Sequence, residues 1–181
     1  MSAIIRSFSG RYAALSPTFL SGFFYDGDEY QSAAAAFEAA KIMTRADRVS
    51  FFAWNCKPWE ARRKGKAIPP SWIRPDFDSV QADVMLAIQR SRFSWPETQR
   101  VLLSTADADL VYGNVVHDNY WGICSCLHVA PSKLKYGIGR NCTGKGQNLQ
   151  GKILMQVRQE LLETKLPVIS ASHGVLEKEY A

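Results

Sequence analysis

The sequence predicts a single compact α+β domain, made mainly of helices packed around a few short strands. Its 181 residues fall in the size range of one domain, and 46% of them are apolar, which is enough for one sizeable core. Several stretches have the 3.6-residue spacing of helices, and short β-prone stretches lie between them. We expect the domain to span residues 1–166, with a small polar C-terminal tail over 167–181.

The first 30 residues mix aromatic residues with Gly, Pro and Ser, which predicts short strands. Asp26-Gly27 is a strong turn signal between two β-prone stretches. A helix is expected over 33–43, because Ser32 suits the N-cap position and the run that follows is rich in alanine, the best helix former.

Residues 57–76 contain several prolines, so this basic stretch predicts a short helix followed by a long connection. Asp76 or Asp78 begins the next helix, because apolar residues from Val80 to Phe93 recur at helical spacing.

A shorter helix is expected to start at Pro96 and to continue to Leu103. Short strands are predicted at 110–112 and 122–126. The last helix starts near Gln150, and its apolar face is formed by Ile153, Leu154, Val157 and Leu161.

Composition limits the classes of function. No apolar run reaches the length of a membrane span and no secretory signal opens the chain, so we expect a cytoplasmic (intracellular) protein that does not associate with membranes. Its four cysteines are too few for a disulfide framework. The net charge of +5 is concentrated in residues 57–66, which suggests an anionic partner, although a solvated surface explains the charge equally well.

The helix that bears Lys41 is the first candidate for chemistry. Ala34, Glu38 and Lys41 share one helical face, at positions i, i+4 and i+7. A lysine beside an alanine-rich surface can act as a nucleophile or hold a phosphate. An ordinary surface ion pair between Glu38 and Lys41 is the alternative.

The second candidate is the segment 118–122, which combines Asp118 with Trp121 and ends in Gly122. A sugar or base could stack on the indole while the carboxylate handles a proton, and a buried Trp beside a turn-forming Asp is the alternative. The third candidate is the glycine- and lysine-containing segment 144–152, where backbone N–H groups before the last helix could hold a phosphate. This segment is not a Walker A motif.

Cys124, Cys126 and His128 alternate along a predicted strand, with His117 nearby. A single C-x-C-x-H fits no standard zinc spacing, so the sequence favours free buried thiols over a metal site. We therefore predict neither a metal nor a cofactor.

Taken in this order, the three candidates resemble the NADAR family, which includes N-glycosidases that act on riboflavin-pathway intermediates and on ADP-ribose-related substrates. The resemblance extends from about Phe8 to Leu162. It is carried by Phe8/Gly10/Tyr12, Tyr25-Asp26-Gly27, Ala39-Ala40-Lys41, residues 58–65, Arg74 with Asp76 and Asp78, Leu102-Leu103-Ser104-Thr105, Asp118-x-x-Trp121-Gly122 and Gly146-x-Asn148-x-x-Gly151.

Two departures from the family pattern stand out. The family's Glu-His pair is replaced by Ala34-Ala35, and its Leu-Ser-Asn-Phe-Tyr is replaced by residues 15–19. The first departure removes the carboxylate that the family is thought to use in catalysis. Three interpretations follow: Glu38 takes over this role, the chain binds its ligand without hydrolysing it, or the alanines were introduced to trap a ligand.

The resemblance implies cleavage of an N-glycosidic bond in a ribosylated or ADP-ribosylated nucleotide-type substrate, which is a small molecule or a nucleic acid. It implies a catalytic set and a substrate-binding set. The first comprises Lys41, Asp118, Glu38 and position Ala34, and the second comprises Trp121, Gly122, Asn148, Arg62, Arg63, Arg74 and Gly151. The non-catalytic alternatives are an ADP-ribose or nucleotide reader and a nucleic-acid-binding protein, the latter using the basic stretch with Trp54, Trp59 and Trp72.

Overall fold

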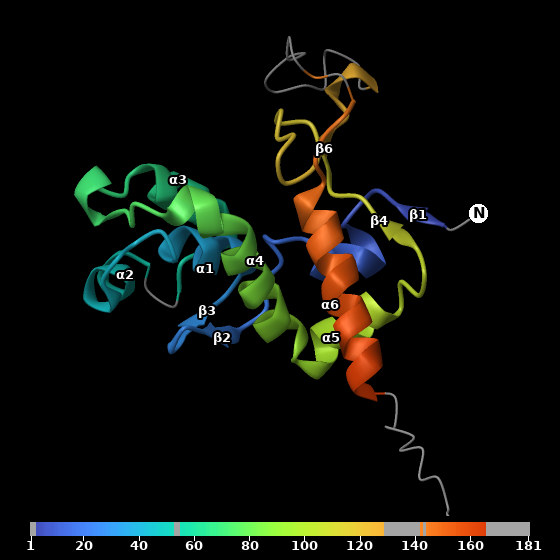
Figure 1. Ribbon diagram of the computed structural model, residues 1–181, viewed down its shortest axis with the longest axis horizontal. Helices are drawn as coiled ribbons and strands as arrows, with labels where there is room; N and C mark the ends of the chain where they lie inside the picture. The colour runs from blue at the N-terminus through green and yellow to red at the C-terminus, as the bar shows by residue number, and fades with distance from the viewer. Residues whose placement is uncertain (1–2, 53–54, 129–141, 143, 166–181) are drawn as a thin grey trace, which may run out of the picture.

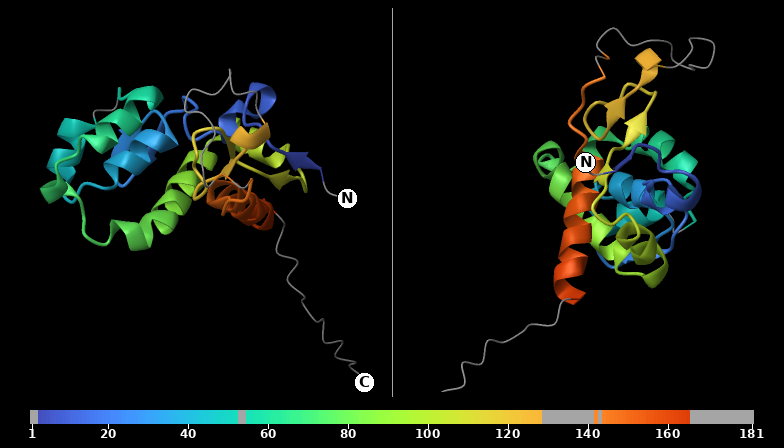
Figure 2. Two further views of the ribbon diagram at one scale, coloured as in Figure 1. Left: turned by 90° about the horizontal axis from the view of Figure 1, so that it is seen from above. Right: turned by 90° about the vertical axis from the view of Figure 1, so that its right-hand side faces the viewer.

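Helix α4 (Phe77–Phe93) runs through the middle of the molecule and separates two groups of elements (Figures 1 and 2). The hairpin and the helices of residues 23–66 lie on one side, and the helices of residues 96–103 and 149–165 lie on the other, together with the strand pair formed by residues 4–5 and 109–110. The computed structural model describes residues 3–52, 55–128, 142 and 144–165. Within these residues the strands form three two-stranded pairs among the helices, so the predicted α+β class is confirmed.

The hairpin of β2 (Phe23–Tyr25) and β3 (Asp28–Tyr30) is antiparallel, with Phe23 opposite Tyr30. Asp26 and Gly27 connect the strands with φ angles of 50° and 81°. Positive φ at both central residues is the backbone conformation that tight hairpin turns need, so the turn prediction is confirmed.

Helix α1 (Ala33–Ala39) begins as predicted, because the Ser32 hydroxyl accepts a hydrogen bond from the Ala35 N–H at 3.2 Å. It ends four residues before the predicted end at 43. Ile42 instead forms a β-bridge with Ile73, and the Lys41 carbonyl accepts a hydrogen bond from Arg74 N at 2.8 Å. Contacts with a distant segment therefore override the helical propensity of this stretch.

Two further helices complete this side of the molecule. Helix α2 (Arg45–Phe51), which we did not predict, is capped by Thr44, whose hydroxyl accepts a hydrogen bond from Asp47 N. Helix α3 (Pro58–Lys66) is the predicted short basic helix, and it packs against α1. The connection to α4 contains the 3₁₀ turn η2 (Pro70–Trp72).

On the other side, the 3₁₀ helix η1 (Gly10–Leu15) packs against the predicted helix α5 (Pro96–Leu103). Strand β1 (Ile4–Ile5) pairs in parallel with β4 (Asp109–Leu110), and β4 contacts α6 (Leu149–Lys165), the predicted last helix. The buried side chains of α1, α4 and α6 belong to one hydrophobic core.

Strands β5 (Gly113–Asn114) and β6 (Ile123–Cys124) form the third pair, which is also parallel, and η3 (Cys126–His128) follows. The strands near 110–112 and 122–126 are thus shorter than predicted. The predicted tail over 167–181 lies outside the described residues. Among the helices that the structure describes, none combines the length and the apolar character that crossing a membrane requires.

Candidate functional site

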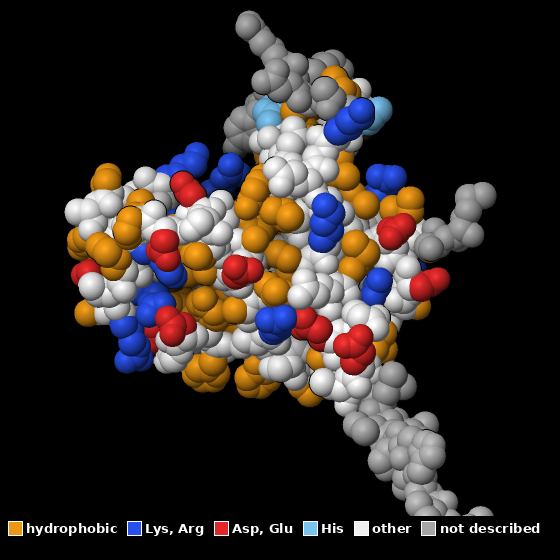
Figure 3. Space-filling model, in the orientation of Figure 1, with side chains coloured by type: hydrophobic (Ala, Val, Ile, Leu, Met, Phe, Trp, Pro, Cys, Tyr) orange, Lys and Arg blue, Asp and Glu red, His pale blue; other side chains and the backbone are white. Residues whose placement is uncertain are grey.

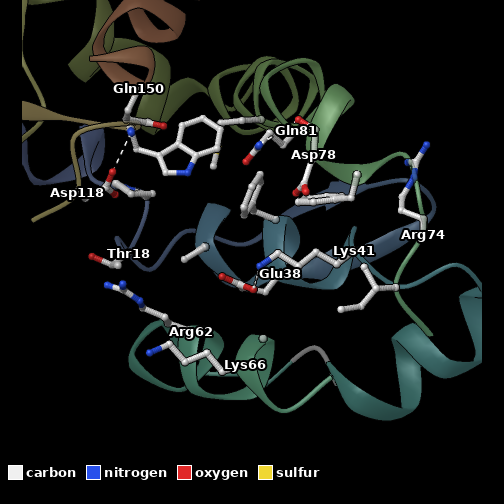
Figure 4. Close-up of a pocket in the computed structure, with 18 of the residues that line it drawn as sticks. Thr18, Glu38, Lys41, Arg62, Lys66, Arg74, Asp78, Gln81, Asp118 and Gln150 are labelled. Atoms are coloured by element: carbon white, nitrogen blue, oxygen red, sulfur yellow. Dashed lines mark hydrogen bonds and ion pairs between the residues drawn. The ribbon is translucent and has the colours of Figure 1, made fainter. Parts of the chain in front are cut away.

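A cavity of about 960 Å³ opens between α1, α3, the start of α4 and the loop that precedes β6 (Figure 4). Seven residues that the sequence indicated as site residues line it: Ala34, Glu38, Lys41, Arg62, Arg74, Asp118 and Trp121. They come from segments that are far apart in the sequence. The fold thus brings the first two candidate segments to one cavity, and their catalytic roles stay predictions.

The Lys41 ammonium and the Glu38 carboxylate form an ion pair inside the cavity, with Nζ 2.5 Å from Oε2. The side chains are only 24% and 15% exposed, so solvent screens the pair less than it would at the surface. The ammonium also lies over the rings of Phe37 and Phe77, 5.6 and 5.7 Å from their centroids. Glu38 packs directly on Gly65 of α3, where any side chain would overlap the carboxylate.

Asp118 is held in place by the backbone of its own loop. Its Oδ1 accepts hydrogen bonds from the N–H groups of Tyr120 and Trp121 at 3.1 and 2.9 Å, and its carbonyl accepts one from the Asn114 amide at 2.6 Å. Both side-chain bonds fall on Oδ1, which leaves Oδ2 as the oxygen that can act on a ligand. The Trp121 indole packs edge-to-face on Phe37, with ring centroids 5.1 Å apart.

Three N–H groups of the predicted phosphate site before α6 already have partners in the protein, so they are not available to a phosphate. The N–H groups of Gln147, Leu149 and Gln150 donate to the carbonyls of three consecutive loop residues, Asn119, Tyr120 and Trp121. The loop carbonyls thus satisfy N–H groups that an α-helix leaves unpaired at its start. These bonds also fix the loop that carries Asp118 and Trp121.

Three predicted substrate contacts lie outside the lining of this cavity. Asn148 adopts a positive φ of 53°, and its amide accepts from Tyr112 N and donates to the Leu110 carbonyl, both at 2.9 Å. Gly151 lets α6 approach the Leu110 carbonyl, and Gly122 lets β6 approach the Tyr112 carbonyl, since a methyl group at either position would overlap that oxygen. These residues position the site instead of contacting the cavity.

The two neighbouring arginines of α3 have different environments. Arg62 lines the cavity, whereas Arg63 does not; its side chain is 78% exposed and lies 3.8 Å from Glu60. Lys66, one helical turn after Arg62, also lines the cavity, and sequence reasoning missed it. Arg74 lines the opposite end and forms two hydrogen bonds to Asp76, both 2.7 Å long.

Sequence reasoning also missed two polar lining residues. Gln150 is only 1% exposed, and its Nε2 is a buried donor with no hydrogen-bond partner among the described residues. Burial, followed by the negative charge of Asp118, raises the pKa of the Tyr112 hydroxyl, and Arg62 offsets part of this rise. Tyr112 therefore stays protonated and can donate a hydrogen bond at neutral pH. No local pattern marks either residue, because both reach the cavity through long-range packing.

A second cluster of chemically reactive side chains lies near β5 and β6, outside the cavity. It consists of His117, Cys124, Cys126 and Cys142, whose ligand atoms all lie within 4.8 Å of one another. His128, the histidine of the C-x-C-x-H pattern, is exposed and is not part of this group. The prediction of free buried thiols is confirmed, because all four cysteines are free and buried. The convergence of the four side chains, with Cys142 among them, was not predicted.

Comparisons with known proteins identify relatives of this chain. The chloroplastic riboflavin biosynthesis proteins PYRR of Zea mays and Arabidopsis thaliana are 35% and 33% identical to this chain over 111 and 94 residues. These matches cover 59% and 51% of the chain, but only 15% and 13% of the plant proteins.

The NMR structure of the E. coli protein YbiA has the same fold, with a TM-score of 0.71 and 28% sequence identity. The match covers 96% of this chain and 94% of YbiA. The sequence profile of the NADAR domain matches residues 7–162, close to the limits at which the motifs begin and end. This chain belongs to the NADAR domain family.

Proposed function

We propose that the cavity binds a ribosylated, phosphate-bearing nucleotide-type ligand and that the chain hydrolyses its N-glycosidic bond. One observation carries the proposal: Lys41, Asp118 and Trp121, from separate segments, line one cavity together with Glu38. An aromatic surface, two carboxylates and a cation in one cavity are the groups that cleavage of a sugar–base bond calls for.

The cavity walls supply complementary groups for the parts of such a ligand. Trp121 offers an aromatic surface for a base or the apolar face of a sugar. Arg62 and Lys66 lie on one α3 face and suit a phosphate. The buried Gln150 amide gains the acceptor that it lacks when a ligand carbonyl or hydroxyl occupies the cavity.

In the reaction that we propose, water attacks the anomeric carbon, the bond from this carbon to the base nitrogen breaks, and the water oxygen stays on the sugar. One carboxylate takes the proton of water and an acid returns a proton to the leaving nitrogen. Glu38 and Asp118 are the candidates for these roles, and the Lys41 ammonium holds Glu38 or a ligand phosphate.

The test is incubation with ADP-ribosylated guanosine and with a ribosylamino-pyrimidine phosphate, with released base measured by mass spectrometry. Replacing Lys41 or Asp118 with Ala should abolish release from the accepted substrate. The adjacent arginines provide a matched pair: Arg62→Ala should raise KM or Kd, whereas Arg63→Ala should not, since Arg63 does not line the cavity. If neither compound binds or is cleaved, the proposal is wrong.

A ligand reader without activity is the second candidate, and the observation that favours it is the side chain at position 34. Ala34 lines the cavity, so the position that carries a glutamate in the family pattern offers only a methyl group here. Ala34→Glu and Glu38→Ala separate the two functions. An active enzyme loses turnover with Glu38→Ala, whereas a reader binds ligand without turnover and gains hydrolysis only with Ala34→Glu.

A further inference from the structure

We propose that His117, Cys124, Cys126 and Cys142 form a structural zinc site. Their four ligand atoms lie within 4.8 Å of one another, although Cys142 is 25 residues away from His117 in the sequence. Three thiols and one imidazole match the Cys₃His ligand set of structural zinc sites. The part of the chain that the structure describes contains no other such group.

The distances from the His117 imidazole to two of the sulfurs are close to those of a tetrahedral zinc site. With Zn–S bonds of about 2.3 Å and Zn–N bonds of about 2.0 Å, neighbouring ligand atoms lie about 3.5 to 3.8 Å apart. His117 Nδ1 lies 3.1 Å from the Cys142 sulfur and 3.7 Å from the Cys124 sulfur. Small side-chain rotations therefore suffice to place a metal ion between these atoms.

The surroundings of the cluster support a metal site over simple packing. All three sulfurs are buried, and the cysteines form a group separate from the main hydrophobic core. The Asn119 side-chain amide contacts two of the cysteines. Its nitrogen lies 4.0 Å from the Cys142 sulfur, and its oxygen accepts a hydrogen bond from Cys124 N at 3.1 Å. Groups that orient metal ligands in this way are typical of metal sites.

The local backbone explains how an unusual C-x-C spacing can work. Cys124 ends the short strand β6 and Cys126 starts the 3₁₀ turn η3, so the chain changes direction between the two sulfurs. His117 adopts a positive φ of 65° in the loop between β5 and β6. Both described histidines lie at this end of the molecule (Figure 3), but only His117 joins the cluster.

The full chain, purified under reducing conditions without chelator, tests the proposal by elemental analysis and by cobalt titration of the metal-stripped protein. We expect about one zinc per chain and, with Co²⁺, the intense visible bands and thiolate charge-transfer bands of a tetrahedral thiolate site. Cys124→Ser and Cys142→Ser should remove these signals. Cys56→Ser is the matched control, because Cys56 is equally buried but lies in the main core.

Two further variants sharpen the assignment. Asn119→Ala should weaken zinc binding by about 10- to 100-fold while leaving the ligand set intact. His128→Ala should leave the affinity unchanged, because His128 is outside the cluster. The proposal is overturned if wild-type protein binds zinc and cobalt only substoichiometrically, if two of the clustered cysteines form a disulfide in freshly reduced protein, or if Cys56→Ser loses the metal to the same extent.

Discussion

Replacing Gly65 with Ala tests the packing between α1 and α3 that holds the Glu38 carboxylate. In an ordinary helix this change stabilises by about 1 kcal/mol, because alanine has the higher helix propensity. Here a methyl group would overlap the carboxylate of Glu38, whose Oε2 lies 2.5 Å from the Lys41 ammonium. The carboxylate is the end of a flexible side chain, so it should move away and weaken its ion pair.

The magnitude follows from these opposing effects. Overpacking costs about 1 to 3 kcal/mol, so Gly65→Ala should leave stability unchanged or lower it by up to about 2 kcal/mol. In a Glu38→Ala background the overlap is absent, and the same change should stabilise by about 1 kcal/mol. The cycle should therefore show a coupling energy of about 1 to 3 kcal/mol.

Urea unfolding of the wild type, both single variants and the double variant measures this coupling, provided that the transitions are two-state. If Gly65→Ala stabilises both backgrounds to the same extent within about 0.5 kcal/mol, the contact between Glu38 and Gly65 does not exist as described. If the protein has turnover, Gly65→Ala should lower its rate, because the Glu38 carboxylate is displaced, and should not prevent ligand binding.

Four further outcomes are expected. Ser32→Ala should cost about 1 kcal/mol in thermal or urea unfolding, since it removes the N-cap of α1, and an unchanged midpoint would contradict this role. Asn148→Ala should lower the free energy of unfolding by about 2 to 4 kcal/mol, because it leaves two backbone groups without partners and forces alanine into positive φ. If the variant instead keeps full stability and loses ligand affinity, Asn148 contacts the ligand as the sequence predicted. Arg90 lowers the pKa of the Glu160 carboxyl in the folded protein. This ion pair therefore stabilises the fold above the unfolded-state pKa of Glu160, and the stabilisation is lost as pH falls through the folded-state pKa. Glu160→Gln should lower the free energy of unfolding by at most about 1 kcal/mol at pH 7 and should have no effect near pH 3. Chelation should lower the free energy of unfolding of the wild type and of Cys56→Ser alike, by up to about 4 kcal/mol, and their melting temperatures should fall accordingly. An unchanged melting curve would argue against a structural metal.

The sequence revealed local features well and long-range features poorly. The helix N-cap at Ser32 and the turn at Asp26-Gly27 depend on neighbouring residues, and both were predicted correctly. The early end of α1 depends on pairing between Ile42 and Ile73, which no local pattern reports. Helix α2 was missed even though Thr44 and Asp47 have the spacing of a helix start.

The candidate site shows the same division. The distinction between Arg62 and Arg63 was available in principle, because Arg62 and Lys66 are one helical turn apart and must share a face. The roles of Asn148 and Gly151 were not available, since they depend on how closely α6 approaches the Leu110 carbonyl. The cluster of sulfurs was missed because Cys142 meets Cys124 only through the tertiary fold.

The loop between β5 and β6 connects the two sites, and this connection has a physical consequence. The N–H groups of Tyr120 and Trp121 hold the Asp118 carboxylate within this loop, so its position in the cavity depends on how the loop itself is anchored. The Asn119 carbonyl accepts from Gln147 before α6, and its side chain reaches Cys124 and Cys142. The residues on either side of Asp118 thus contact the cluster, and loss of a metal there would weaken one of the two anchors of the loop, while the bonds to the segment before α6 remain. Ligand affinity should then fall together with zinc content, even though no cluster residue lines the cavity.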